Sequence, residues 1–410
     1  MRIGLCGGTF DPLHNGHYAL VQAARHHGGL DRIIVMPAGR PPHKLTHAVS
    51  MAGYRYEMAC RAFSDQPDIC VSDLEIRRPG RSYTLNTIQQ LQQDLPDESE
   101  LILVYGSDVL YEIERWHETA AILAACPLLL AQRGGYSHQS NQDQAEYLRR
   151  KYGARINFFS APDIELSGTQ IRRAVQMRQP YRQWVPEPVA EVIHRNGLYR
   201  YQDELSELDP DLWMRFYNLE QQLWPTLSRK RMLHSLNVLI YALHLARIHD
   251  VAAESAGLAA LLHDCAKCLP REDMIQYAAL AGDRSLMDDE LAHGPAGAWM
   301  ARQQYQIADP AILQAIQYHT TGCRGMSKLD KIIFIADKVE PARTYTHLSE
   351  IRRLAETDLD RAMLICLREI DSFLIREKLT PHPYTNEARA ELAGKNCPGR
   401  EEPAESASAE

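Results

Sequence analysis

At 410 residues the chain is too long for one ordinary domain, and a typical size of about 150 residues per domain predicts two or three. Hydrophobic residues make up 45% and charged residues 24%, which is the balance of a soluble globular protein. The formal net charge of -8 argues against a nucleic-acid partner, because proteins that bind the phosphate backbone usually carry a basic excess.

The sequence also carries expectations about its compartment. No apolar run approaches the length of a membrane span, and residues 1–3 lead into the first apolar stretch without the hydrophobic segment of a signal peptide. The nine cysteines are odd in number and irregularly spaced, which favours reduced thiols over a disulfide framework. We therefore expect a cytoplasmic protein with no membrane partner. The oligomeric state stays open, and a homo-oligomer is compatible with the sequence.

Residues 1–200 alternate short apolar runs with helical patterns. The apolar runs predict strands at residues 3–6, 32–37, 69–76, 101–105, 127–131 and 156–159. The helical patterns between them cover residues 18–24, 54–63, 84–93, 144–151 and 168–177. This alternation predicts a Rossmann-like α/β fold with a mainly parallel sheet, in which ligands bind at the carboxyl ends of the strands.

Residues 7–17, Gly-Gly-Thr-Phe-Asp-Pro-Leu-His-Asn-Gly-His, join the first predicted strand to the first predicted helix. Gly7 and Gly8 let the backbone approach a ligand closely, and the positive end of the following helix favours a phosphate. His14 and His17 are three residues apart at a helix start, so their rings can point the same way. Two imidazoles beside backbone amides suit a phosphoryl centre that gains negative charge during reaction. A Gly-Gly pair alone indicates only a turn, but the whole unit favours a functional site.

Two other predicted strands are followed by segments with chemically useful residues. Lys44 lies in the loop Pro-Pro-His-Lys, which taken alone is more typical of a solvated charged loop. Asp108 follows the strand at residues 101–105, where a carboxylate can hold a ribose hydroxyl or cap the next helix. Trp116 can stack on a flat ring, although a tryptophan at helical spacing more often belongs to a core.

Residues 166–172, Leu-Ser-Gly-Thr-Gln-Ile-Arg, form a second motif at a helix start. Ser167 or Thr169 can cap the helix, while Arg172 can bind an anion through two parallel hydrogen bonds. Serine and threonine caps are common, so without the first motif the functional and the purely structural interpretations weigh about equally.

Together the two motifs resemble those of the nucleotidyltransferases, which move an adenylyl or cytidylyl group from a nucleoside triphosphate to a phosphate. Within that group the chain is similar to the bacterial nicotinate-nucleotide adenylyltransferases, through Pro-Pro-His-Lys, Ser-Tyr-Thr-Leu-Asn-Thr at residues 82–87, Gly-Ser-Asp before Trp116, and Gln132-Arg133. The resemblance implies adenylyl transfer from ATP to nicotinate mononucleotide with Mg²⁺ on the triphosphate. Nicotinamide mononucleotide and phosphopantetheine remain alternative substrates, and no residue identifies the partner of the nicotinate carboxylate.

The same resemblance implies roles for individual residues. Catalysis would depend on His14, His17 and Lys44. ATP would contact Gly7, Gly8, Thr9, Phe10, Ser167, Thr169 and Arg172. The mononucleotide would contact Tyr83, Thr84, Asp108, Trp116 and Arg133.

The second half has a different character. Residues 201–211 are acidic and polar, and we expect them to form a linker between a domain at 1–200 and a domain at 212–385. Strand patterns are absent beyond the linker, so the second domain is predicted to be all-α. The composition of residues 386–410 cannot support a core, and these residues are expected to be a disordered tail.

Six histidines and aspartates of the second half end or interrupt apolar helical runs: His234, His263, Asp264, His293, His319 and Asp337. An unpaired polar group in the interior costs a few kcal/mol, and a single such histidine is usually a hydrogen-bonded core residue. Several helices that deliver such residues to one interior are better explained by a metal, whose ligands offset one another's desolvation. Imidazole and carboxylate ligands suit iron, manganese or zinc.

The order of these residues resembles the HD-domain metal phosphohydrolases, and most closely the bacterial iron-dependent symmetrical bis(5′-nucleosyl)-tetraphosphatases. The resemblance implies hydrolysis of diadenosine tetraphosphate to two ADP. His234, His263, Asp264 and Asp337 would bind metal, and Asp264 would also serve catalysis. His293 and His319 would complete a second metal site or contact phosphate. The polyphosphate would contact Arg231, Lys267, Thr320 and Arg343 as well.

The sequence leaves other possibilities for the second half open. Its substrate could be a dNTP or a guanosine polyphosphate, or the domain could be a nucleotide sensor or an oligomerisation module without catalysis. The native metal, the number of ions and any coupling between the two halves are likewise open.

Overall fold

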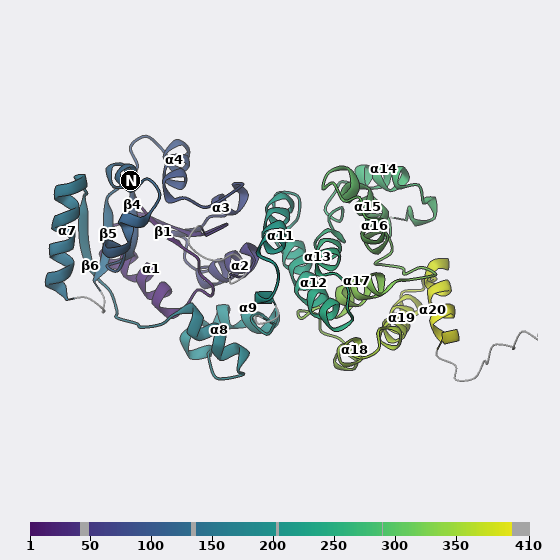
Figure 1. The fold of residues 1–410 in the computed structure, drawn as a ribbon. Coiled ribbons are helices and arrows are strands. Elements are labelled where there is room, and N and C mark those ends of the chain that lie inside the picture. The colour runs from purple at the N-terminus through teal and green to yellow at the C-terminus, as the bar shows by residue number, and fades with distance from the viewer. Residues whose placement is uncertain (42–48, 133–136, 202–204, 289, 396–410) are drawn as a thin grey trace, which may run out of the picture. The chain divides into compact units, whose positions relative to one another are not determined.

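The computed structural model describes residues 1–41, 49–132, 137–201, 205–288 and 290–395. It contains two compact units, Met1–Leu236 and Asn237–Glu410 (Figure 1). The division falls inside helix α12 (Arg229–Ile248), so this helix contributes residues to both units.

The first unit contains a six-stranded parallel sheet, which confirms the predicted α/β fold. The strands lie in the order β3-β2-β1-β4-β5-β6, and every neighbouring pair is parallel. The strand order reverses between β1 and β4, the point at which such sheets bind ligands. Their bounds are β1 (Arg2–Gly8), β2 (Arg32–Pro37), β3 (Ile69–Val71), β4 (Glu100–Gly106), β5 (Leu128–Gln132) and β6 (Ile156–Ser160).

The central strands are apolar along most of their length, as expected for strands that are buried on both faces. Leu103 and Val104 of β4 and Leu128 and Leu130 of β5 are fully buried. The helices of this unit are α1 (Asn15–His27), α2 (Ala52–Ala62), α3 (Leu74–Arg77), α4 (Thr84–Asp94), α5 (Val109–Glu112), α6 (Thr119–Ala125), α7 (His138–Tyr152), α8 (Gly168–Gln176), α9 (Glu187–Arg195) and α11 (Pro210–Leu223).

The strand predicted at residues 69–76 is too long. Strand β3 ends at Val71, and residues 74–77 form the short helix α3. The hydroxyl of Ser72 accepts a hydrogen bond from the backbone N–H of Leu74, and the carbonyl of Asp73 accepts from Ile76 and Arg77. Short polar side chains that bond nearby backbone groups compete with sheet pairing, which explains the early end of the strand.

The boundary between the halves also differs from the expectation. Helix α11 begins inside the predicted linker, where Asp209 caps it and Pro210 occupies its first position. It belongs to the first unit, which extends to Leu236 rather than ending at residue 200. The reason is that its side chains are buried there, including Trp213, Phe216 and Tyr217.

The second unit is helical throughout its described residues, which confirms the predicted all-α half. Its helices after α12 are α13 (Ala253–Leu262), α14 (Arg271–Ala281), α15 (His293–Gln303), α16 (Pro310–Gln317), α17 (Lys328–Val339), α18 (Leu348–Ala355), α19 (Leu359–Arg376) and α20 (Pro383–Lys395). Helix α13 packs against α15, α16 and α17 (Figure 1). Within the described part of the chain, no helix combines the length and apolarity needed to cross a membrane.

The tail predicted from residue 386 onward is helical as far as residue 395. Ala388 and Leu392, four residues apart on α20, are buried. The hydroxyl of Thr385 donates to the carbonyl of Thr321 at 2.9 Å, and the carboxylate of Glu391 accepts from the backbone N–H of Gly325 at 2.6 Å. One apolar face and two anchoring hydrogen bonds are thus enough to order this segment. Residues 396–410 lie outside the described residues.

Candidate active sites

The turn between β1 and α1 places His14 and His17 side by side. Their rings stack with centroids 3.7 Å apart and planes 22° apart. Nδ1 of His14 accepts a hydrogen bond from the backbone N–H of His17, and Nδ1 of His17 accepts one from the backbone N–H of His14. In the neutral ring an accepting Nδ1 leaves the proton on Nε2, so each ring is a donor through Nε2. The first turn of α1 has no acidic residue to offset its positive end.

A cavity of about 450 Å³ opens at the carboxyl ends of β1, β2 and β4. This volume lies within the range of small-molecule sites. Most residues predicted to bind ATP or the mononucleotide line this cavity, although they come from distant parts of the sequence. They are Gly7, Gly8, Thr9, Phe10, Tyr83, Thr84, Asp108 and Trp116, and His17, predicted to be catalytic, lines the cavity too. Lys44 and Arg133 lie outside the described residues.

The second motif meets the first one in space. Arg172 donates to the carbonyl of Asp11 at 2.7 Å across 161 residues of sequence, and its other terminal nitrogen donates to the hydroxyl of Thr169. Ser167 caps α8 by accepting from the backbone N–H of Gln170. A Cβ atom at Gly168 would lie 2.5 Å from the carbonyl of Asp11, so only glycine permits this approach. Ser167, Thr169 and Arg172 therefore stand beside the first motif, but they do not line the cavity described above.

Two residues that line the cavity, Glu75 and His117, were not predicted from the sequence. Glu75 is buried and accepts from the hydroxyl of Thr87 at 2.6 Å, and burial raises the pKa of its carboxyl. Glu75 falls within the strand predicted at residues 69–76, whereas in the structure it lies on helix α3. His117 directly follows Trp116, and its ring centroid lies 4.5 Å from that of Tyr83. Its place next to a predicted binding residue was the only signal for it.

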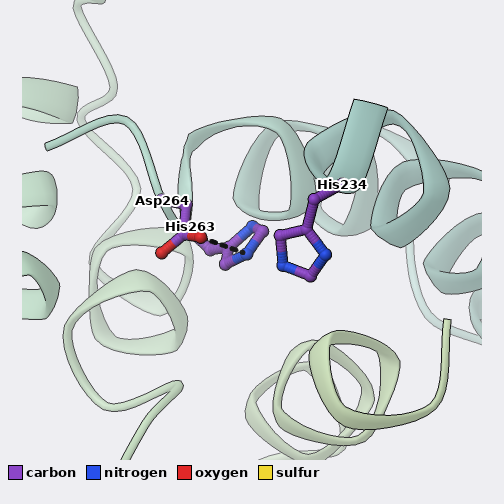
Figure 2. A group of neighbouring side chains, drawn as sticks. All are labelled: His234, His263 and Asp264. Carbon is purple, nitrogen blue, oxygen red and sulfur yellow. Dashed lines mark ion pairs between the residues drawn. The ribbon is translucent and has the colours of Figure 1, made fainter. Parts of the chain in front are cut away.

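In the helical half, His234, His263 and Asp264 form one cluster (Figure 2). One ligand atom from each side chain lies within 4.8 Å of the others. His234 comes from α12, while His263 and Asp264 follow the last turn of α13. Nδ1 of His263 donates to the carbonyl of Ala260 at 2.7 Å, which directs Nε2 toward the oxygens of Asp264 at 3.7 Å and Asp337 at 4.0 Å. A carbonyl that holds Nδ1 in this way is the usual support of a metal-binding imidazole.

Asp264 also belongs to a second cluster, with His293 at the start of α15 and His319 just after α16. Its Oδ1 lies 3.5 Å from Nε2 of His293 and 3.8 Å from Nε2 of His319. Nδ1 of His319 donates to the carbonyl of Ile316 at 2.7 Å, which repeats the arrangement at His263. One carboxylate is thus shared by two sets of possible metal ligands.

The protonation states suit a metal. Burial by itself would raise the pKa of Asp264, but the imidazoles of His263, His293 and His319 outweigh it and leave the pKa below its ordinary value. Burial lowers the pKa of His319 to about 4 and that of His293 well below its ordinary value. An ionised carboxylate among neutral imidazoles is the donor set that a divalent cation requires.

The residues predicted to hold a polyphosphate lie around these clusters. Nζ of Lys267 is 3.1 Å from Nδ1 of His293, and the hydroxyl of Thr320 is 3.3 Å from Nε2 of the same ring. Arg231 lies three residues before His234 on α12.

Asp337 lies next to the first cluster, with its Oδ1 4.0 Å from Nε2 of His263. Its carboxylate accepts from Arg343 at 3.1 Å and also pairs with Lys338, a neighbour that the sequence predictions did not include.

Comparisons with known proteins also divide the chain into two parts. Residues 5–174 match the family model described as cytidylyltransferase-like, and residues 231–342 match the model of the HD domain. The fold and its sites therefore define a nucleotidyltransferase-type α/β unit followed by a helical HD domain.

Similar proteins identify the family of the first half. A probable nicotinate-nucleotide adenylyltransferase of Desulfitobacterium hafniense (strain Y51) is 39% identical over 204 residues, which covers 48% of this chain and 96% of that protein. One from Clostridium botulinum (strain Alaska E43 / Type E3) is 36% identical and covers 48% of this chain and 98% of that protein. The chain belongs to the nicotinate-nucleotide adenylyltransferase family through its first half.

A solved structure is similar over a comparable length. It is described as a predicted HD superfamily hydrolase involved in NAD metabolism from Clostridium acetobutylicum, and it is 37% identical, with a TM-score of 0.42. The match covers 43% of this chain and 96% of that chain.

Proposed function

We propose that the chain is a bifunctional enzyme. Its first unit transfers the adenylyl group of ATP to nicotinate mononucleotide and releases pyrophosphate. Its HD domain hydrolyses diadenosine tetraphosphate symmetrically to two ADP. For the first activity the main support is the stacked pair of His14 and His17 beside a cavity lined by the predicted nucleotide-binding residues, together with the names of the similar proteins.

The first reaction needs positioning and charge stabilisation more than covalent chemistry. An oxygen of the mononucleotide phosphate bonds to the α-phosphorus of ATP as the bond to the β-phosphate oxygen breaks, and pyrophosphate leaves with that oxygen. The Nε2 donors of His14 and His17 stabilise the charge that develops at the α-phosphorus. Arg172, with Ser167 and Thr169 at the start of α8, binds the departing phosphates. Mg²⁺ on the triphosphate would offset part of its charge.

The first activity is tested by a comparison of acceptors. Purified protein is supplied with Mg²⁺ and ATP and with nicotinate mononucleotide, nicotinamide mononucleotide or phosphopantetheine, and the dinucleotide and pyrophosphate are measured. We expect the highest kcat/KM with nicotinate mononucleotide. A higher value with either alternative would reassign the substrate.

For the HD domain, the main support is Asp264, which is shared by two clusters of buried histidines. His234, His263, Asp264 and Asp337 would hold one metal, and His293 and His319 would hold a second metal or contact phosphate. The metal would supply a bound water that is hydroxide near neutral pH, and iron is the proposed metal. Lys267, Thr320, Arg231 and Arg343 bind and orient the polyphosphate.

The second activity is tested with protein prepared without oxygen and supplied with Fe²⁺. Diadenosine tetraphosphate, a dNTP and a guanosine polyphosphate are offered separately, and the products are separated by chromatography. ADP as the single product from diadenosine tetraphosphate is the expected result. AMP and ATP would mean asymmetric cleavage, and nucleotide binding without turnover would instead support a sensor.

A further inference from the structure

Helix α11 lies beyond the region that matches the cytidylyltransferase-like model, yet it is packed within the first unit. Tyr217 and Glu220 are 2% and 0% exposed. A fully buried carboxylate is rare unless its environment compensates for the lost water. The partners of Glu220 therefore indicate what α11 does.

Glu220 caps a different helix. Its two carboxylate oxygens accept from the backbone N–H groups of Ala52 at 3.0 Å and Gly53 at 2.7 Å. These are the first two residues of α2, and Met51, at the capping position, provides no side-chain acceptor. A negative group at a helix N-terminus pairs otherwise unsatisfied N–H groups and interacts favourably with the helix dipole. Glu220 thus fixes the start of α2 from 168 residues away in sequence.

Helix α2 in turn holds the wall of the cavity through Arg55, which is 0% exposed. The guanidinium donates to the carbonyls of Thr9 at 3.0 Å and Gly39 at 2.9 Å, and also to that of Ala38. Thr9 and Ala38 line the cavity. A planar guanidinium with several fixed acceptors sets the position of all of them at once.

Tyr217, another residue of α11, contacts the same region. The hydroxyl of Tyr217 lies 2.7 Å from the carbonyl of Val49 and 2.9 Å from that of Ser50. The carbonyl of Ser50 also accepts from Arg55. The backbone N–H of Ser50 donates to the carboxylate of Asp11 in the first motif.

Residues at the end of α11 and just after it also contact a second segment at the cavity, residues 73–78. Trp224, just after α11, donates to the carboxylate of Asp73, and Gln221 donates to the carbonyl of Arg78 at 3.1 Å. Glu75, between these two acceptors, lines the cavity.

On the basis of the proposed adenylyl transfer, we propose that α11 completes the first active site. Glu220 is a positioning residue that acts through α2 and Arg55 on Thr9 and Ala38. The alternative is that α11 only covers apolar surface of the first unit. The two differ in whether loss of the carboxylate changes the reaction or only the stability.

The test compares Glu220→Gln and Glu220→Ala with the wild type, and Glu207→Gln, an exposed residue before α11, is the control. Transfer from ATP to nicotinate mononucleotide is measured at about pH 8, where an acid with a pKa near 7 is ionised, and well below the unfolding midpoint of each variant. We expect kcat/KM to fall about tenfold in Glu220→Gln and further in Glu220→Ala, because small displacements of binding groups slow positioned reactions steeply. Metal content and tetraphosphate hydrolysis should stay unchanged. A lower unfolding midpoint with kcat/KM within about twofold of wild type would overturn the proposal.

A measurement without substrate separates this proposal from the proposed function. Amide hydrogen exchange is recorded for the peptides that contain residues 9, 38–39 and 49–53. Faster exchange at all three in Glu220→Gln, and not in Glu207→Gln, is the expected result. If the wild type makes no dinucleotide, the proposed function fails, and unchanged exchange in Glu220→Gln would still overturn the role of Glu220.

Discussion

His14 and His17 exchange hydrogen bonds, each through the Nδ1 atom of one ring and the backbone N–H of the other residue. This pairing fixes both rings at the start of α1 and leaves both Nε2 atoms as the donor sites. Because each ring is held by a backbone N–H, replacement of one side chain removes the stacking contact but keeps the hydrogen bond that orients the other ring.

The first prediction concerns His17→Ala. We expect nearly unchanged ATP binding and a fall in kcat of about a hundredfold or more, since one fixed donor at a developing charge typically contributes that much. Steady-state rates and calorimetric ATP binding provide the measurements. His26→Ala, on the exposed face of the same helix, is the matched control. An ordinary kcat in His17→Ala would remove the catalytic assignment.

The second prediction concerns Asp264→Asn. Loss of the carboxylate shared by the two clusters should release bound metal and lower tetraphosphate hydrolysis by at least about a hundredfold, since loss of a mere supporting partner of a ligand already costs tenfold to a hundredfold. Adenylyl transfer should be unaffected. Metal analysis and both assays are compared with Asp273→Asn, an exposed aspartate on α14. Full metal content in Asp264→Asn would contradict the assignment.

The third prediction is a pH dependence of stability. Burial raises the pKa of Glu220 from 4.5 to about 7. Between those values the folded state binds more protons than the unfolded state, so this group's contribution to stability is present below about pH 4.5 and is lost as pH rises through 7. The full change is roughly 3 kcal/mol.

Denaturant unfolding of the wild type and Glu220→Gln at about pH 5 and about pH 8 isolates this contribution from other titrating groups. The loss of stability at the higher pH should be smaller in Glu220→Gln. Equal losses in the two proteins would show that Glu220 keeps an ordinary pKa.

The fourth prediction concerns the anchor of α20. Thr385→Val keeps the shape of the side chain but leaves the buried carbonyl of Thr321 without its donor. We expect the free energy of unfolding of the second unit to fall by about 1–3 kcal/mol. Thr380→Val, at an exposed position, should change little. A loss of equal size in the two variants would mean that the hydrogen bond contributes nothing specific.

The sequence was most informative where a local pattern determines the structure. The pattern of apolar residues and the turn residues between them predicted the six strands. The spacing of His14 and His17 predicted the shared orientation of their rings. Helical runs that end in histidine or aspartate predicted that such residues meet in one interior, where the ring of His319 lies 5.0 Å from those of His263 and His293. In each case the determining signal lies within a few neighbouring residues.

Contacts between residues far apart in the sequence were harder to predict. The acidic stretch before residue 212 is typical of a linker, but Trp213 and Tyr217 behind it are buried against the first unit, and nothing near them in sequence shows this. Glu220 looks like an ordinary helix-surface acid until Ala52 and Gly53 are seen as its partners. The order of α20 similarly depends on a turn more than 60 residues earlier, as the 64-residue separation of Thr385 and Thr321 indicates.

Helix α12 limits how this polypeptide can be taken apart. Its first residue, Arg229, pairs with Glu57 of α2 at 3.0 Å, His234 belongs to a histidine–aspartate cluster, and Asn237 donates to Glu340 at 3.0 Å. A cut on either side of this helix deprives one of the two halves of side chains it uses. Separate expression of the two halves with all of these side chains would require residues 229–248 to be present twice, once in each piece.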